Sequence, residues 1–99
     1  MARFHVYGMK AGTAYALDVQ SNMLDGLNTR VMIPLIDAAN VSQVMMRLNP
    51  HILVNNKRYL LATERMAAVP VAEIGELITD LTCQGDEITA ALDFLFQGF

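Results

Sequence analysis

The sequence predicts a small, mainly β domain of the α+β class that ends in a single α-helix. Short segments that alternate polar and apolar residues, separated by Gly, Asn and Asp, recur along the first part of the chain. Apolar residues repeat at three- and four-residue spacing only after Asp80. One antiparallel sheet followed by one helix accounts for both patterns.

Length and composition predict one domain with an apolar interface. A chain of 99 residues is large enough to bury roughly 60 to 65% of its unfolded surface, so we expect a single domain over residues 1–99. Hydrophobic residues make up 54% of the chain and charged residues 17%, which is apolar for so small a domain. An obligate homodimer would bury the excess apolar surface.

Charge and cysteine content exclude several classes of protein. The net charge is -3 and the basic residues are scattered, so no basic stripe is present and direct DNA or RNA binding is not expected. Cys83 is the only cysteine, which excludes an internal disulfide and suggests a small packing residue in the reducing cytoplasm. No apolar run reaches the length of a membrane span. We therefore expect a soluble cytoplasmic protein without membrane contact.

The N-terminal half predicts a hairpin and a third strand. Residues 3–7 and 14–19 alternate polar and apolar side chains around a turn at residues 10–12, as in a β-hairpin. Residues 30–36 are apolar and β-prone. Pro34 lies within this strand, and because proline cannot donate a ladder hydrogen bond, we expect an edge strand or a bulge there.

The middle of the chain predicts a second hairpin. Residues 37–49 fit either a short helix or an irregular segment. Residues 51–54 and 57–63 flank an Asn-Asn pair that tolerates positive φ, which indicates two strands joined by a tight turn. Residues 66–71 are interpreted as one further strand.

A helix is expected near the end of the chain. Asp86 and Glu87 favour a helix N-terminus, and Gly98 favours a helix end. Phe96 extends one border of the apolar stripe, whereas Phe94 on the opposite border would suit either the edge of the core or a second contact surface. The stripe itself consists of Ile88, Ala91, Leu92 and Leu95.

The sequence predicts no catalytic, metal-binding or cofactor-binding residues. His5 and His51 each fall in a predicted strand, and with Cys83 they are too few and too scattered for a zinc site. Carboxylates near the strand ends are expected to be solvated rather than to act as general acids or bases. These carboxylates are Asp18, Asp25 and Asp37.

Four blocks of residues together resemble the CcdB toxins of toxin–antitoxin modules. The resemblance implies an SH3-like, barrel-type antiparallel sheet with one C-terminal α-helix, assembled as a homodimer. The blocks are Asp18-Val19-Gln20-Ser21 with the later Asp25; Arg30 with Ile33-Pro34-Leu35; Met66-Ala67-Ala68-Val69-Pro70-Val71 with Ile74-Gly75-Glu76 and Asp80-Leu81; and the terminal helix with Phe96 and Gly98.

The resemblance implies a toxin that acts by binding, not by catalysis. In this family the dimer binds the A subunit of DNA gyrase and traps the complex with cleaved DNA. The family has tryptophan where this chain has Gln97, and the loss of such a stacking contact would cost ~0.5 to 2 kcal/mol per copy. The implied gyrase-binding residues are Met23, Leu24, Asp93, Gln97, Gly98 and Phe99.

The second implied partner is a CcdA-like antitoxin, which neutralises the toxin and carries the DNA contact in repression of the module. The family directs residues 8–13 and 40–49 toward it. Two alternatives stay open. The chain could keep the dimer and antitoxin binding but have lost or switched gyrase poisoning, because of Gln97. A nuclease would instead need His5 or His51 beside carboxylates or arginines in one pocket.

Overall fold

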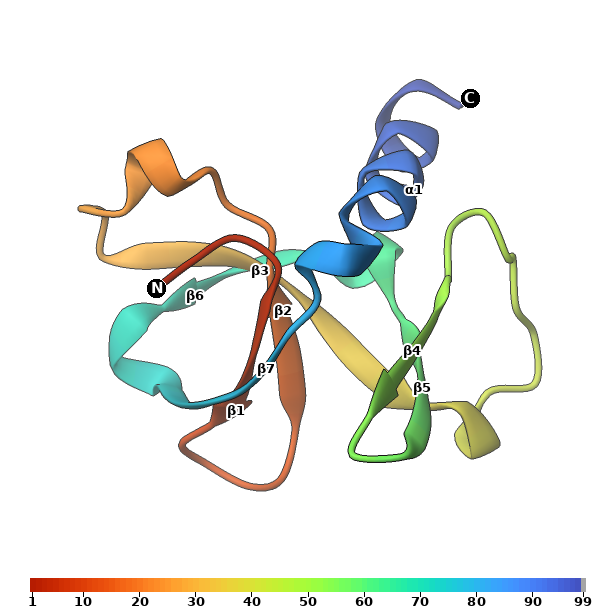
Figure 1. Cartoon of the computed structure of the whole chain (residues 1–99), viewed down its shortest axis with the longest axis horizontal. Coiled ribbons are helices and arrows are strands. Elements are labelled where there is room, and N and C mark those ends of the chain that lie inside the picture. Colours follow the sequence, from red (N-terminus) through yellow and green to blue (C-terminus); the bar gives the residue numbers. More distant parts are fainter. Residues whose placement is uncertain (99) are drawn as a thin grey trace.

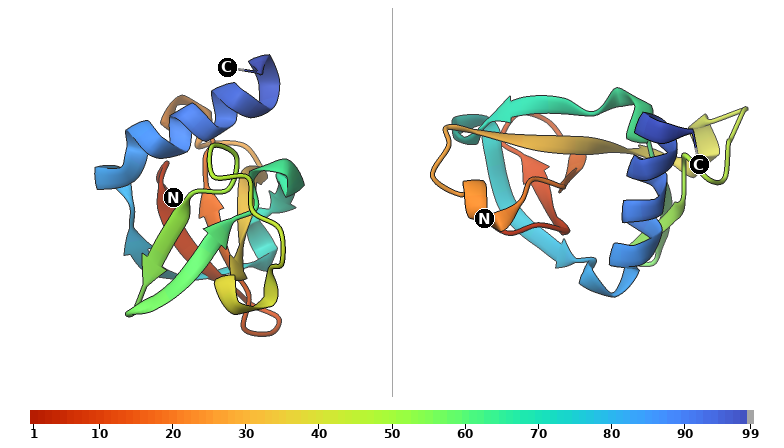
Figure 2. Two further views of the ribbon diagram at one scale, coloured as in Figure 1. Left: turned by 90° about the vertical axis from the view of Figure 1, so that its right-hand side faces the viewer. Right: turned by 90° about the horizontal axis from the view of Figure 1, so that it is seen from above.

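Seven strands form one antiparallel sheet that curls into a half-barrel, and a single α-helix lies across it (Figures 1 and 2). The computed structural model describes residues 1–98. The sheet order is β4-β5-β3-β2-β1-β7, and β6 also pairs with β3. The elements are β1 (His5–Met9), β2 (Tyr15–Asp18), β3 (Thr29–Asp37), β4 (His51–Val54), β5 (Lys57–Leu61), β6 (Ala67–Pro70), β7 (Ile74–Asp80) and α1 (Gly85–Gln97).

Both predicted hairpins are confirmed. Strands β1 and β2 pair with Val6 opposite Leu17. Strands β4 and β5 are joined by Asn55 and Asn56, whose φ values are 51° and 64°. Two successive positive φ angles match the twist of a two-residue hairpin turn, and asparagine adopts them more readily than most residues.

Strand β3 is central and its pairings have no register shift, so the prediction of an edge strand or a bulge around Pro34 is wrong. It pairs with β2 on one side and with β6 and then β5 on the other. Pro34 lies at the switch between these last two partners, after Met32 pairs with β6 and before Leu35 pairs with β5. Its carbonyl accepts from the Ala62 N–H at 3.0 Å. Because the missing N–H of proline coincides with the gap between partners, a central strand tolerates it.

Strand β7 was not predicted, and its residues depart from strict alternation. It pairs with β1 through a register that shifts twice. A Cβ built on Gly75 would lie 2.6 Å from the carbonyl oxygen of Gly8, which no real side chain allows. Glycine at this position therefore permits the close approach of two backbones, and it also weakens the strand signal in the sequence.

Of the two structures predicted for residues 37–49, a short helix or an irregular segment, the irregular segment is found. A short 3₁₀ turn covers Ala38–Asn40, capped by the Asp37 side chain, which accepts from the Ala39 N–H. Residues 41–50 then continue without regular structure. The turn-forming asparagines and serine at this position outweigh the helical spacing of the apolar residues.

The core has two parts because alternate residues of the strands point to opposite faces. Val6, Leu17 and Ile33 face the larger cluster, which the helix closes with Ile88. Their neighbours on the same strands, Tyr7, Ala16 and Met32, face a second cluster that Ile74 completes.

Helix α1 packs on the sheet through Ile88 and Ala91, which are fully buried, as the stripe predicts. Gly98 ends the helix with φ of 80°, and its N–H donates to the Phe94 carbonyl at 3.0 Å. Phe96 is 69% exposed, so its assignment to the border of the buried stripe is wrong; it lies beyond the last turn that reaches the sheet.

The segment before the helix gives one more correction. Cys83 is exposed within the short 3₁₀ turn Thr82–Gln84, so it is not a packing residue. Within residues 1–98, no helix combines the length and the apolar character needed to cross a bilayer.

Candidate functional site

The loop between β2 and β3 displays apolar side chains to solvent. Met23 is 93% exposed, Leu24 49% and Leu27 51%. The loop nevertheless has defined structure, because Asn22–Leu24 form a 3₁₀ turn whose cap, the Ser21 hydroxyl, accepts from the Met23 N–H at 3.2 Å. The sequence singled out Met23 and Leu24, whereas Leu27 was missed, although its place beside Gly26 in a turn-rich segment marks it as exposed.

A buried polar network lies beneath this loop. Arg30 and Asp18 are 1% and 0% exposed, and the Arg30 Nη2 and Nε atoms lie 2.7 and 2.8 Å from Asp18 Oδ2. Arg30 Nη1 reaches Asp25 Oδ1 at 3.3 Å. The expectation that Asp18 is a solvated loop carboxylate is wrong, because an arginine twelve residues further along the chain neutralises it inside the sheet.

Gln20 joins the same network to the loop backbone. Its side-chain amide donates to the Leu24 carbonyl at 3.1 Å, and its side-chain oxygen accepts from the Val31 N–H at 3.0 Å. The backbone N–H of Gln20 donates to Asp18 Oδ1 at 3.0 Å. Hydrogen bonds of Gln20 thus connect the end of β2, the middle of the loop and the start of β3.

The C-terminal turns of α1 form a second exposed surface. Asp93, Gln97 and Gly98 are exposed, in agreement with the helical-wheel position of Asp93. Phe94 is half-buried beneath Arg47, whose guanidinium carbon lies 4.4 Å from the ring centroid. Phe99, the last of the expected binding residues, lies outside the described residues.

Within one chain the loop and the helix end do not form a continuous surface. Residues 21–28 lie near one end of the longest molecular axis, and the end of α1 lies in the opposite half of the molecule, with both projecting from the same side of the sheet (Figure 1). The loop leaves the sheet at the β2–β3 connection, whereas α1 contacts the short turn Thr63–Arg65 near β5. The two sets of expected binding residues therefore lie apart on the same side of the sheet within one chain.

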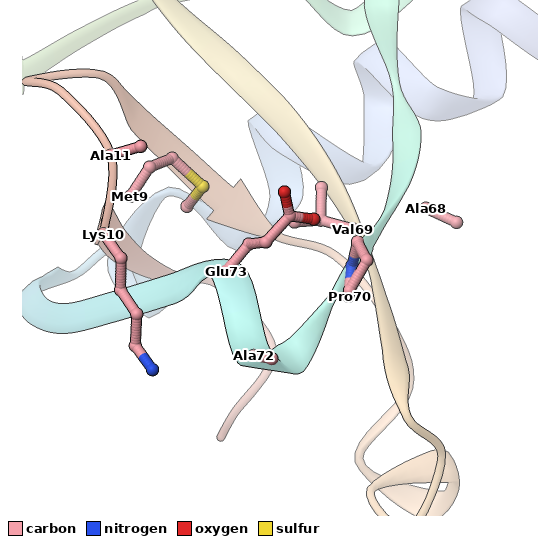
Figure 3. A pocket seen from close by; sticks show the side chains of 8 residues that line it. All are labelled: Met9, Lys10, Ala11, Ala68, Val69, Pro70, Ala72 and Glu73. Atoms are coloured by element: carbon pink, nitrogen blue, oxygen red, sulfur yellow. The ribbon is translucent and has the colours of Figure 1, made fainter.

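Two hollows border residues 8–13 and 40–43, parts of the segments that the resemblance predicts to face an antitoxin. The first, of about 470 Å³, opens beside the loop of residues 8–13 (Figure 3). The second, of about 330 Å³, lies along residues 40–43 and contacts Glu64 and Arg65. The first hollow is mainly apolar, and its lining residues are Met9, Lys10, Ala11, Ala68, Val69, Pro70, Ala72 and Glu73.

The two histidines do not meet in a pocket. His5 is in β1 and His51 is in β4, with β2, β3 and β5 between them in the sheet. His5 Nε2 lies 3.5 Å from Asp80 Oδ2. Hydrogen bonds from the Thr82 hydroxyl and amide lower the pKa of Asp80, and His5 adds a smaller effect. Across residues 1–98, no group of three His, Cys, Asp or Glu side chains is arranged to hold a metal ion.

Solved structures of similar fold include two mycobacterial proteins. The toxin MazF-mt6 of Mycobacterium tuberculosis has a TM-score of 0.76 and 14% identity, with 95% of this chain and 96% of that chain covered. An endoribonuclease in complex with its cognate antitoxin, from a mycobacterial species, has a TM-score of 0.74 and 16% identity, with 94% and 91% covered. At such low identity these likenesses establish the fold alone.

The sequence itself gives a more specific relationship. The family model described as CcdB protein matches residues 3–98, which is nearly the whole chain. The curled antiparallel sheet and its C-terminal helix agree with the fold that the four sequence blocks imply. The chain therefore belongs to the CcdB family.

Proposed function

We propose that this protein is the toxin of a type II toxin–antitoxin module, which binds the A subunit of DNA gyrase and traps the complex with cleaved DNA. The observation that carries the proposal is the 93% exposure of Met23 on a loop with defined structure. An exposed apolar side chain on an ordered loop is unfavourable in water unless a partner covers it. Membership of the CcdB family supports gyrase as that partner.

The proposed contact surface combines the loop with the helix end. It consists of Met23, Leu24, Asp93, Gln97, Gly98 and Phe99, supplied by both protomers of a homodimer. Because a symmetric dimer presents each surface twice, it suits a target that is itself two-fold symmetric. Dimerisation also offers burial for part of the apolar surface that a single chain exposes.

The antitoxin is proposed to bind along residues 8–13 and 40–49. The mainly apolar hollow beside the first segment supports this assignment. Val44, Met45 and Met46 are 41%, 56% and 58% exposed in the second segment. Methionine adapts its shape to a partner, so this segment suits a peptide that folds as it binds.

The protein is proposed to act without catalysing a reaction. Its fold resembles that of endoribonucleases. His5 lies beside Asp80, but neither of the two hollows described above is lined by a histidine, which argues against a histidine-based nuclease. The alternative is a homologue that keeps the dimer and antitoxin binding but has lost or switched gyrase poisoning. The replacement of the family tryptophan by Gln97 favours that alternative.

Gyrase-mediated DNA cleavage with purified protein tests the proposal. We expect the wild-type chain to stabilise cleaved DNA and a truncation that lacks Gly98 and Phe99 to lose this effect. Gln97→Trp restores a stacking surface in both protomers, so it should raise the apparent affinity by a few powers of ten at most. If only Gln97→Trp traps cleaved DNA, the homologue with a lost or switched target is the correct account. RNA degradation by the wild type would instead identify a nuclease.

Substitution of the exposed loop gives an independent test. Met23→Ser should leave the free energy of unfolding within about 0.5 kcal/mol of wild type, because the side chain is exposed, but should weaken gyrase binding. Leu77→Ser is the matched control, since Leu77 is 53% exposed in β7, outside the proposed surface. Equal binding by the two variants would exclude the loop from the gyrase contact.

A further inference from the structure

The polar network around Arg30 reaches the exposed loop from three sides. Asp18 ends β2 before the loop, Asp25 lies within it, and Arg30 follows it near the start of β3. Nη1 and Nη2 of Arg30 contact Asp25 Oδ1 at 3.3 Å and the Gln20 carbonyl at 3.4 Å. The network therefore connects the ends of the loop to its middle, and Asp25 Oδ1 also lies 3.6 Å from the terminal amine of Met1.

Stability alone is a weak reason for this arrangement. The free energy needed to remove two charges from water can exceed the gain from their attraction. Apolar residues of similar volume often stabilise a core equally well or better. Arg30 and Asp18 are 1% and 0% exposed, so this cost applies in full. A pair of apolar residues could not fix the path of the loop backbone. The network does so through hydrogen bonds to the carbonyls of Gln20 and Leu24.

The outer side of the loop is held in the same way. The Arg3 backbone N–H donates to Asn22 Oδ1 at 2.8 Å, and the Ser21 hydroxyl caps the turn that carries Met23 and Leu24. Polar contacts thus hold this turn in place, because its apolar side chains face solvent and do not pack in the core. A binding loop that is already ordered loses less conformational entropy when it meets its partner.

We propose that Asp18, Gln20 and Arg30 are positioning residues, which form a buried polar network that holds residues 21–28 in the conformation that presents Met23 and Leu24 to a protein partner. This inference rests on the proposed function for the identity of that partner. It assigns a role to two of the sequence blocks that mark the family, since Asp18, Gln20, Asp25 and Arg30 all belong to them.

The first arm of the experiment uses the free protein. Gln20→Met keeps the length of the side chain and removes both of its hydrogen bonds. We expect the NMR backbone order parameters of residues 22–27 to fall from about 0.85 to below about 0.6. The control is Ile52→Val, which loosens the core in β4 without touching the network and should leave the loop order parameters unchanged. An unchanged loop in Gln20→Met would overturn the proposal.

The second arm measures affinity for purified gyrase A subunit at a temperature where all variants are folded. Gln20→Met should weaken binding by about 5- to 30-fold, as expected for a residue coupled to a contact residue. Ile52→Val should change the affinity less than about twofold. In a Met23→Ser, Leu24→Ser background the Gln20→Met effect should disappear, because the residues that it positions are gone. An effect of the same size in that background would contradict a positioning role.

The two proposals fail separately. If the wild-type chain does not bind gyrase A subunit while the order of the loop still depends on Gln20, the proposed function is overturned and the positioning of the loop stands. If the wild type binds gyrase but Gln20→Met binds equally well, the function stands and the positioning role for binding is overturned.

Discussion

Asp80 illustrates how neighbouring groups set the charge of a single exposed side chain. Hydrogen bonds from the Thr82 hydroxyl and amide lower its pKa, and both favour the ionised carboxylate. The contribution to folding stability is therefore present above the ordinary pKa of aspartate, near ~4, and is lost as the pH falls through the lower folded value. We expect Thr82→Val to move the pKa of Asp80 upward toward that ordinary value.

The measurement is an NMR titration of the aspartate side-chain carbons. Asp37 serves as an internal reference, because hydrogen bonds from Lys57 and the Ala39 amide lower its pKa, and neither involves Thr82. An Asp80 titration that is the same in wild type and Thr82→Val would show that the hydroxyl does not set this pKa.

Single residues were predicted well where solvent exposure follows from local pattern. The exposure of Asp93 follows from its position on the helix. Met23 and Leu24 were singled out through the family resemblance, and both are exposed. Burial of Asp18 could not be read from its neighbours, since it depends on Arg30 in another strand. The contact of Arg47 with Phe94 likewise joins residues far apart in the sequence.

At the scale of elements, Gly75 holds strand β7 against β1. Its replacement by alanine would place a Cβ 2.6 Å from the Gly8 carbonyl oxygen, so one backbone must move. We expect Gly75→Ala to reduce the free energy of unfolding by about 1 to 3 kcal/mol, as for overpacking of a well-fitted site. Urea unfolding monitored by circular dichroism measures this change.

The control for that prediction is Gly26→Ala. A Cβ on Gly26 meets nothing within 4 Å, so alanine should be tolerated there. If the two variants unfold at the same urea concentration, the close approach at Gly75 is not a constraint on the sheet.

Elements with their own local signals were predicted, and those that depend on partners were not. The Asn-Asn turn and the apolar stripe of α1 are properties of contiguous residues, so both hairpins and the helix were recovered. Polar and apolar residues do not alternate strictly in β7, because the close approach of the β1 backbone requires glycine at position 75. Pro34 was misinterpreted because the switch from β6 to β5 beside it is invisible in the sequence.

For the whole molecule, the distribution of apolar surface leads to a prediction about assembly. Large apolar side chains are exposed in the β2–β3 loop, in residues 44–46, on β4 and β7, and at Phe96 in α1. We expect a homodimer in solution, with a melting temperature that rises with protein concentration. Sedimentation equilibrium measures the mass directly, and a monomer at all concentrations would contradict this prediction.

The contact between Arg47 and Phe94 has a thermodynamic consequence. It joins the segment that exposes Met45 and Met46 to the last turns of α1, and such a contact contributes ~0.5 to 1 kcal/mol at an exposed site. A ligand that draws the segment away from the helix must first break it. Thermodynamic linkage is reciprocal. If binding at the segment changes the affinity for a ligand at the helix end by some factor, binding at the helix end changes the affinity at the segment by the same factor. The Arg47–Phe94 contact is thus one physical connection between the two surfaces.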